Sequence, residues 1–269
     1  MRLVSLAHLT AIELDPPALI HAAAEGGFDA VGLRLLRVTP TTPGYPLWEN
    51  AAMLRETRAA MTATGVTVHD IEFLRITPET DPETLQPFLD TGAELGAKEI
   101  ITAPYDPDHG RMADTLGRLS DAARDRGLGV VLEFFPWTTI RTIDEAVQTV
   151  GQAGPHVGIL PDSLHVDRSG SSLATLASLG PERLRFAHLC DAPVLPAYDE
   201  ETLLHAAREE RLLPGTGQID LGAYLAALPK DLPLGVEVPR TARAHRVGAL
   251  ELVRETGSAV RSFLASVGR

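Results

Sequence analysis

Short apolar runs alternate with longer segments of helical periodicity along almost the whole chain. Residues 130–137 (VVLEFFPW) are a typical run, and the helical segment before them ends at a glycine. The runs predict eight strands, at residues 2–9, 28–36, 66–76, 98–105, 130–137, 156–165, 183–192 and 232–239. The segments between and after them predict helices at residues 15–27, 48–64, 81–96, 111–126, 142–151, 172–179, 221–228 and 249–267.

The character of the strands indicates how they are arranged. They are apolar nearly throughout, as expected for a parallel sheet that is covered on both faces, and regular alternation with helices indicates an α/β fold. An open doubly wound sheet usually has a G-x-G-x-x-G loop after its first strand, where this chain has AHLTAIELD. We therefore predict a (β/α)8 TIM barrel, forming a single domain over residues 1–269.

Composition and charge narrow the class of protein. Hydrophobic residues make up 44% of the chain and charged residues 22%, as in a soluble globular enzyme. A net charge of -12 disfavours a nucleic-acid partner, which requires a basic surface. The single cysteine, Cys190, fits a reducing compartment. With no apparent signal peptide and no apolar run of about 20 residues, we expect a cytoplasmic protein with no membrane partner.

Four polar residues recur at equivalent places, at or near the ends of successive apolar strands. Glu133, Asp162, His188 and Glu237 belong to the fifth, sixth, seventh and eighth predicted strands. In a barrel, the carboxyl ends of the strands converge on one face, so these side chains are expected to meet. Three carboxylates and one imidazole suit Mn²⁺, Mg²⁺, Co²⁺ or Zn²⁺. Each residue alone is more often a surface, turn or core residue, and the prediction rests on the coincidence of all four.

The motifs that carry these residues resemble those of a known family. LEFFPW, PDSLHVDRSG, FAHLCDAP, RLLPGTGQIDL and GVEVP resemble motifs of the sugar phosphate isomerase/epimerase superfamily, the xylose isomerase-like barrels, and the likeness spans nearly the whole chain. The resemblance implies a divalent metal bound by Glu133, Asp162, His188 and Glu237. Many members are dimers or tetramers, so it also makes a homo-oligomer an expectation.

The chemistry of such a site is proton abstraction beside a carbonyl. A divalent metal that chelates a carbonyl and a neighbouring hydroxyl acidifies the C–H between them, and a carboxylate can then remove the proton. The resemblance implies that Glu133 and Glu237 are the catalytic acid/base pair as well as ligands. The predicted activity is that of an isomerase or epimerase of a small sugar or keto-polyol. The alternative is a dehydratase (lyase) of a cyclic keto-polyol such as inosose or 3-dehydroshikimate.

Five further residues are predicted to bind substrate. The resemblance implies this role for His165 and for Arg211, which precedes a PGTG turn. Arg168 could bind a carboxylate or phosphate through two hydrogen bonds. Glu72 and His8 could line the pocket, although structural roles are expected more often for residues at such positions.

Other features concern the surroundings of the site and the competing classes. Residues 193–217 are long for a simple loop, and DEETLLHAAREERL within them predicts a helix that covers the metal site. Phe135 and Trp137 either wall the pocket or pack in the core, and Cys190 is predicted to be a packing residue. The family also contains an endonuclease that cuts at abasic DNA sites, which the charge of -12 disfavours. A sugar-binding barrel without catalysis is disfavoured because all four ligand types are present.

Overall fold

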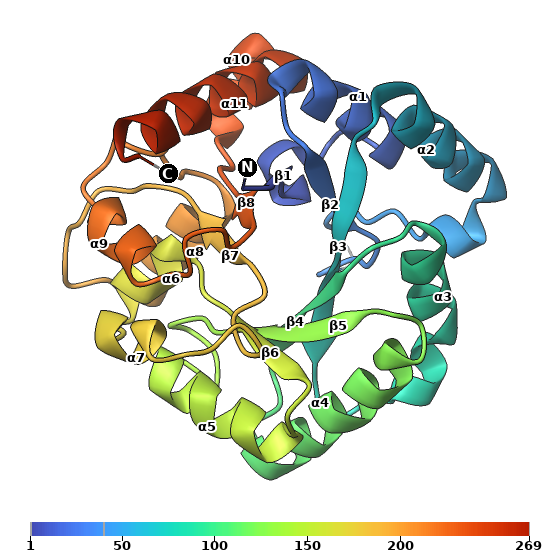
Figure 1. The fold of residues 1–269 in the computed structure, drawn as a ribbon, viewed down its shortest axis with the longest axis vertical. Helices are drawn as coiled ribbons and strands as arrows, with labels where there is room; N and C mark the ends of the chain where they lie inside the picture. Colours follow the sequence, from blue (N-terminus) through green and yellow to red (C-terminus); the bar gives the residue numbers. More distant parts are fainter. Residues whose placement is uncertain (1, 40, 269) are drawn as a thin grey trace.

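The computed structural model describes residues 2–39 and 41–268 and confirms the predicted TIM barrel (Figure 1). Its parallel strands run in the sheet order β6-β5-β4-β3-β2-β1-β8-β7. Isolated parallel bridges, from Ile159 to Leu184 and from Asp162 to His188, join β6 to β7 and bring the sheet close to a closed ring. The strands are β1 (Val4–Leu6), β2 (Ala30–Arg34), β3 (Thr67–Ile76), β4 (Glu99–Pro104), β5 (Gly129–Glu133), β6 (Val157–Leu160), β7 (Ala187–Leu189) and β8 (Leu234–Val236).

Helices surround the ring of strands (Figure 1). The α-helices are α1 (Pro16–Gly26), α2 (Ala51–Thr64), α3 (Gln86–Glu94), α4 (His109–Arg124), α5 (Ile143–Ala153), α6 (Ser163–Arg168), α7 (Leu173–Ala177), α8 (Glu200–Arg208), α9 (Leu221–Ala226), α10 (Thr241–Val247) and α11 (Ala249–Ser266). Short 3₁₀ turns are η1 (His8–Ala11), η2 (Leu47–Glu49) and η3 (Pro82–Leu85). Side chains cap many helix starts; Thr142 and Glu145, for example, form a reciprocal capping box at α5.

Two apolar layers position the functional end of the barrel. The larger layer lies between the strands and the helices. A smaller cluster of Ile101, Val131, Leu160 and Phe186 is fully buried, and Phe73 packs against it. These four residues come from β4, β5, β6 and from just before β7, so they fill the interior of the ring. Polar groups at the carboxyl ends of the strands therefore lie next to a buried apolar cluster inside the barrel.

Some predicted boundaries were wrong, and the largest error falls on residues 156–165. The strand ends at Leu160, and Asp162 caps a helix, α6, that was not predicted. The Asp162 carboxylate accepts a hydrogen bond of 2.7 Å from the backbone N–H of Leu164, which starts the helix. The strands at 183–192 and 232–239 are also shorter than predicted, since β7 and β8 pair only over three residues each. The helix predicted within residues 193–217 is confirmed as α8.

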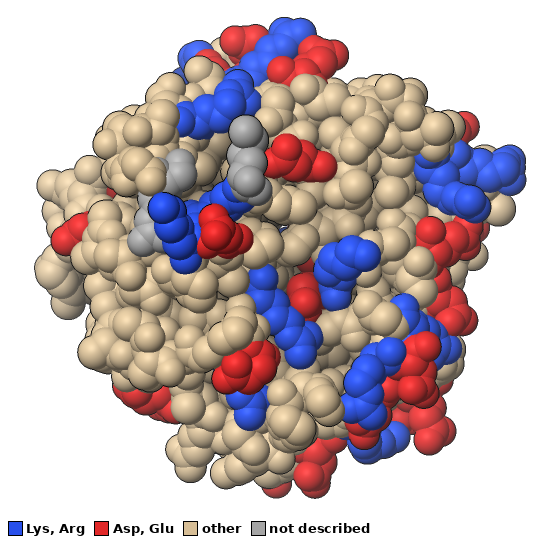
Figure 2. Space-filling view, in the orientation of Figure 1, with Lys and Arg blue, Asp and Glu red and all other residues tan. Residues whose placement is uncertain are grey.

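The surface and the helices add two observations. Figure 2 shows basic side chains interspersed with acidic ones on one face, rather than gathered into one large patch. No helix within residues 2–39 and 41–268 combines the length and apolarity needed to cross a membrane.

Candidate metal centre

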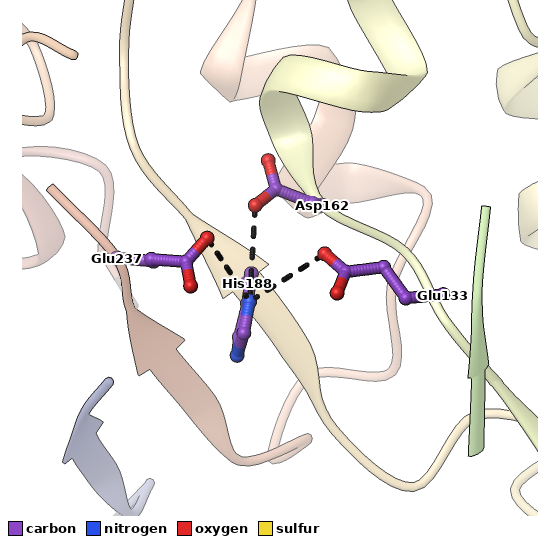
Figure 3. A group of neighbouring side chains, drawn as sticks. All are labelled: Glu133, Asp162, His188 and Glu237. Carbon is purple, nitrogen blue, oxygen red and sulfur yellow. Dashed lines mark ion pairs between the residues drawn. The ribbon is translucent and has the colours of Figure 1, made fainter. Parts of the chain in front are cut away.

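Four side chains from neighbouring strands converge at the carboxyl end of the barrel (Figure 3). Glu133 ends β5, Asp162 follows β6, His188 lies in β7 and Glu237 follows β8. Nδ1 of His188 lies 3.9 Å from Oε1 of Glu133, and 3.8 Å from both Oδ2 of Asp162 and Oε2 of Glu237. One ligand atom of each residue lies within 4.8 Å of the others. We call these four residues the candidate metal cluster.

The cluster fits a divalent metal in its burial and in its donors. Its most exposed member, Glu237, is only 5% exposed. Neither ring nitrogen of His188, nor Oε1 of Glu133, has a hydrogen-bond partner in the described part of the chain. Burying such atoms is costly unless something compensates them. Three carboxylates and an imidazole form a mixed oxygen and nitrogen donor set that divalent metals accept.

A glycine on the neighbouring strand leaves the space that the His188 ring occupies. A Cβ atom on Gly235 of β8 would lie 2.6 Å from Cδ2 of His188. Gly235 and His188 are Cα partners in the pairing of β7 with β8, so the ring lies across the glycine. Any larger residue at this point would displace the imidazole from the cluster.

Arg211 supplies positive charge to the cluster. Its Nη1 lies 2.6 Å from Oδ2 of Asp162, and its Nη2 lies 2.5 Å from Oε2 of Glu237. The side chain is buried, and its Nε donates to the carbonyl of Ala207 at the end of α8. Arg211 therefore lies in the site, as expected, but two cluster carboxylates already occupy its terminal nitrogens. Its predicted contact with substrate stays a prediction.

The surroundings shift the pKa values of the three carboxyl groups of the candidate metal cluster in different directions. Burial, followed by the nearby Glu237 and Asp162 charges, raises the pKa of Glu133 well above its ordinary value. Burial also raises the pKa of Glu237, although Arg211 opposes the shift. Burial alone would raise the pKa of Asp162, but the charge of Arg211 outweighs it together with smaller contributions, so that this pKa is lowered. Asp162 is thus the carboxyl group that the surrounding side chains hold most strongly in its ionised form.

His165 lies beside Glu133 as a buried, neutral imidazole. Its Nε2 is 3.7 Å from Oε1 of Glu133, and burial lowers its pKa to about 3. Its ring packs edge-on against Phe135 and Trp137, with centroid distances of 4.7 and 5.3 Å. Neither ring nitrogen has a hydrogen-bond partner in the chain as described. Both nitrogens are therefore available to a substrate, which agrees with the predicted role of His165 without testing it.

Arg168 lies against the segment that follows β7. Its Nη2 donates to the carbonyl of Pro193 at 2.6 Å, and its Nη1 donates to the hydroxyl of Tyr198 at 2.9 Å. The guanidinium also stacks on the Tyr198 ring at 4.2 Å and pairs with Asp167. These contacts tie residues 193–198 to α6. The predicted binding of substrate by Arg168 stays a prediction.

Asp191 is a buried residue that the sequence did not single out. Its carboxylate accepts hydrogen bonds from the backbone N–H groups of Ala192, Gly215, Gly217 and Ile219, at 2.8 to 3.1 Å. Gly215 has a φ of 84°, a left-handed conformation that suits glycine. Asp191 thus holds the PGTG turn that follows Arg211. A signal for it was present in the sequence, because an aspartate directly after an apolar strand, as in the LCDAP motif, indicates a specific hydrogen-bonding role.

His8 and Glu72 surround a further polar residue that sequence reasoning missed, Arg34. Nε2 of His8 lies 2.8 Å from the carbonyl of Leu14, and Nδ1 accepts the backbone N–H of Arg34 at 2.8 Å. Both nitrogens are engaged, and burial lowers the pKa of His8 to about 4. Glu72 is buried, with its Oε1 3.3 Å from Nε of Arg34. The predicted substrate contacts of His8 and Glu72 stay predictions.

Cys190 agrees with its predicted packing role. The thiol is fully buried between Asp162, Ser163 and Arg211. Burial raises its pKa to about 12, so the thiol stays protonated and unreactive.

These features define a TIM barrel with a candidate metal site at the carboxyl ends of β5 to β8. The profile of the xylose isomerase-like TIM barrel family matches residues 20–258, and the chain belongs to that family.

The most similar curated relatives include sugar-modifying enzymes. An inosose isomerase of Bacillus velezensis is 29% identical over 151 residues, which cover 52% of each chain. A 3-dehydroshikimate dehydratase of Pseudomonas aeruginosa is 32% identical over 117 residues, which cover 43% of this chain and 18% of the relative. The chain thus spans about half the length of the inosose isomerase it matches, and less of the dehydratase.

Solved structures share the whole fold. The IOLI protein with a bound zinc atom superposes with a TM-score of 0.79 at 21% identity, covering 99% of both chains. D-psicose 3-epimerase superposes with a TM-score of 0.74 at 16% identity, covering all of both chains. At these identities, the likenesses show that the barrel fold is shared along the whole chain.

Proposed function

We propose that this chain is a divalent-metal-dependent isomerase or epimerase of a small sugar or keto-polyol. The observation that carries the proposal is the placement of Glu133 and Glu237, whose carboxylates approach Nδ1 of His188 from opposite sides in Figure 3. The proposed ligands are the candidate metal cluster, and the metal is Mn²⁺, Mg²⁺, Co²⁺ or Zn²⁺. The similarity to inosose isomerases supports the substrate class.

The metal would polarise a carbonyl and an adjacent hydroxyl, which makes the hydrogen on carbon acidic. The chain supplies the groups that move that proton. The carboxylates of Glu133 and Glu237 approach Nδ1 of His188 from opposite sides, so one would accept the proton and the other would return one from the opposite face. Return to the same carbon gives an epimer, and return to its neighbour gives an isomer. His165, neutral and beside Glu133, is suited to hydrogen-bond the substrate oxygen.

A second candidate is dehydration of a cyclic keto-polyol. The similarity to the 3-dehydroshikimate dehydratase of Pseudomonas aeruginosa favours it, and the structure of a probable dehydratase of that kind superposes with a TM-score of 0.75. The same proton abstraction would precede loss of a β-hydroxyl group. The two candidates therefore differ only in what happens after Glu133 or Glu237 has taken the proton.

Solvent isotope exchange tests the proposal. Protein loaded with Mn²⁺ is incubated with ketohexoses and inososes in D₂O, and mass spectrometry records deuterium uptake and loss of water. We expect metal-dependent uptake, and Glu133→Gln or Glu237→Gln should each lower its rate by about 10²- to 10⁴-fold. Glu182→Gln, at an exposed residue, is the matched control. Unchanged exchange in both cluster variants would refute the proposal, whereas water loss without isomerised product would favour the dehydratase.

Metal content is a readout that does not depend on activity. Elemental analysis and calorimetric titration of Mn²⁺ should give one bound ion in the wild type and in the Glu182→Gln control. Asp162→Asn removes a proposed ligand, the carboxylate that Arg211 holds in its ionised form, so it should weaken the binding of Mn²⁺. Equal affinity in the variant would remove Asp162 from the ligand set.

A further inference from the structure

Three polar groups inside the barrel are buried without a hydrogen-bond partner in the part of the chain that the structure describes. They are Nε2 of His188, the hydroxyl oxygen of Ser5 and Oδ1 of Asp70, and none of the three residues is more than 2% exposed. Burying such groups is costly, so they usually have a partner in the protein or in an ordered water molecule. The proposed function uses Nδ1 of His188 and leaves these three atoms unexplained.

Neighbouring strands bring the three residues to one side of the barrel interior. In the sheet order, β3-β2-β1-β8-β7 is one continuous run, with Asp70 on β3, Ser5 on β1 and His188 on β7 (Figure 1). Gly235 of β8 is the Cα partner of both His188 and Ser5. Since neighbouring strands lie about 4.8 Å apart, Ser5 lies directly beyond the glycine that the His188 ring covers.

Glycines on β8 and β2 let the side chains on either side lie toward β1. A Cβ on Gly235 would lie 2.9 Å from Nε2 of His188. A Cβ on Gly32 of β2 would lie 2.5 Å from Oδ1 of Asp70, which is the Cα partner of that glycine on β3. The imidazole and the carboxyl group therefore cross their glycines from opposite sides, and the strand between the two glycines carries Ser5.

This half of the ring interior has no apolar filling like that of the other half. The buried apolar cluster inside the barrel comes from β4, β5, β6 and the start of β7. On β1 and β2, Leu6 and Val31 belong to the layer between strands and helices, so Ser5 and Gly32 point into the ring. The interior between β8 and β3 is therefore lined by small and polar residues, which suit a polar occupant.

His69 is the competing partner for His188. Its Nε2 also lacks a hydrogen-bond partner within residues 2–39 and 41–268. Its ring packs edge-on against Phe186 at 4.9 Å, and Phe186 packs against His188 at 5.6 Å. The pairing to Gly235 that Ser5 shares with His188 favours Ser5, and a variant of His69 distinguishes the two.

We infer that Ser5 and Asp70 are positioning residues for His188, and that the three residues together hold one buried water molecule at Nε2. A buried water typically makes about three hydrogen bonds to groups that otherwise lack partners. The water accepts the hydrogen on Nε2 and donates to Oδ1 of Asp70, while the Ser5 hydroxyl supplies the third bond. This arrangement fixes the ring and keeps Nδ1 unprotonated toward the candidate metal cluster. The inference rests on the proposed function only for the task of Nδ1.

The tautomer of His188 tests the inference without metal or turnover. A long-range ¹H–¹⁵N NMR spectrum of metal-free protein with ¹⁵N-labelled histidine distinguishes the Nε2–H form from the Nδ1–H form, and His188→Gln identifies the signals. We expect the Nε2–H form alone in the wild type and in Ser120→Ala, the matched control at a buried serine of α4. Ser5→Ala should give a mixture of both forms, because it removes one partner of the water.

Metal affinity is the second readout. In calorimetric titration, Ser5→Ala and Asp70→Leu should each raise the dissociation constant of Mn²⁺ by about tenfold to a hundredfold. Asp70→Asn keeps an acceptor oxygen, so it should restore the wild-type constant and the single tautomer. A role of Asp70 in packing alone would leave the tautomer of His188 unchanged in both Asp70 variants and would overturn its assignment.

The outcomes separate this inference from the proposed function. A single Nε2–H tautomer and an unchanged Mn²⁺ constant in Ser5→Ala would overturn the inference, and so would a mixture of tautomers in His69→Phe but not in Ser5→Ala. A mixture in Ser5→Ala, with no metal-dependent isotope exchange in the wild type, would uphold the positioning of His188 and refute the proposed function. Ser5→Ala deletes one oxygen atom, so it provides the test if Asp70→Leu does not fold.

Discussion

The burial of His8 makes a specific prediction about stability and pH. The imidazole is fully buried, and both its nitrogens are used by backbone groups, the carbonyl of Leu14 and the N–H of Arg34. The second contact requires an unprotonated Nδ1. Burial therefore lowers the pKa of His8 from its ordinary 6.5 to about 4. The unfolded chain binds more protons than the folded one between these values, so stability is complete above about pH 6.5 and is lost as the pH falls toward 4.

The magnitude follows from the size of the shift. One pKa unit corresponds to about 1.4 kcal/mol, so the full shift of His8 is worth about 3 kcal/mol, of which about 2.5 kcal/mol is lost between about pH 7.5 and 4.5. Other groups titrate in the same range, so the contribution of His8 is measured as a difference. Urea unfolding of the wild type and of His8→Gln at both pH values gives the free-energy cost of the substitution at each.

We expect that cost to fall by about 2.5 kcal/mol on acidification. The wild type loses the stabilisation that comes from a neutral, buried His8, whereas the glutamine variant has no such stabilisation to lose. His21→Gln is the matched control at both pH values, since His21 is exposed on α1. A cost of His8→Gln that is the same at both pH values would show that His8 does not fold as a neutral, buried imidazole, and would refute the reasoning.

Three other substitutions or treatments test separate parts of the structure. Asp191→Ala removes the acceptor of four backbone N–H groups and should lower the free energy of unfolding by about 3 kcal/mol, measured in urea; a loss below about 1 kcal/mol would contradict its role in the turn. Gly257→Ala places a Cβ 2.0 Å from the carbonyl oxygen of Gly26 and should lower the melting temperature, whereas Gly151→Ala, with open space around it, should not. Cys190 should react with an alkylating agent only as fast as the protein unfolds.

The fold and the main cluster could be predicted because both depend on simple spacing. Apolar runs at regular intervals specify the strands, and the barrel brings the ends of neighbouring strands together. The residues that end β5 and lie in β7, Glu133 and His188, therefore met as expected. Boundaries were less predictable because capping competes with strand extension. The apolar residues after Asp162 resemble a continuing strand, but the hydrogen bond from Leu164 turns the chain into α6.

Charge pairing between distant segments could not be predicted from the sequence. Arg211 was expected to contact substrate, yet its partners are Asp162, 49 residues earlier, and Glu237. No local pattern encodes such a pairing. Arg34, in contrast, could have been identified as a buried charged residue from the sequence. A single arginine near the end of an apolar strand is as unusual as a single glutamate in the same position, and Glu133 drew attention for that reason alone.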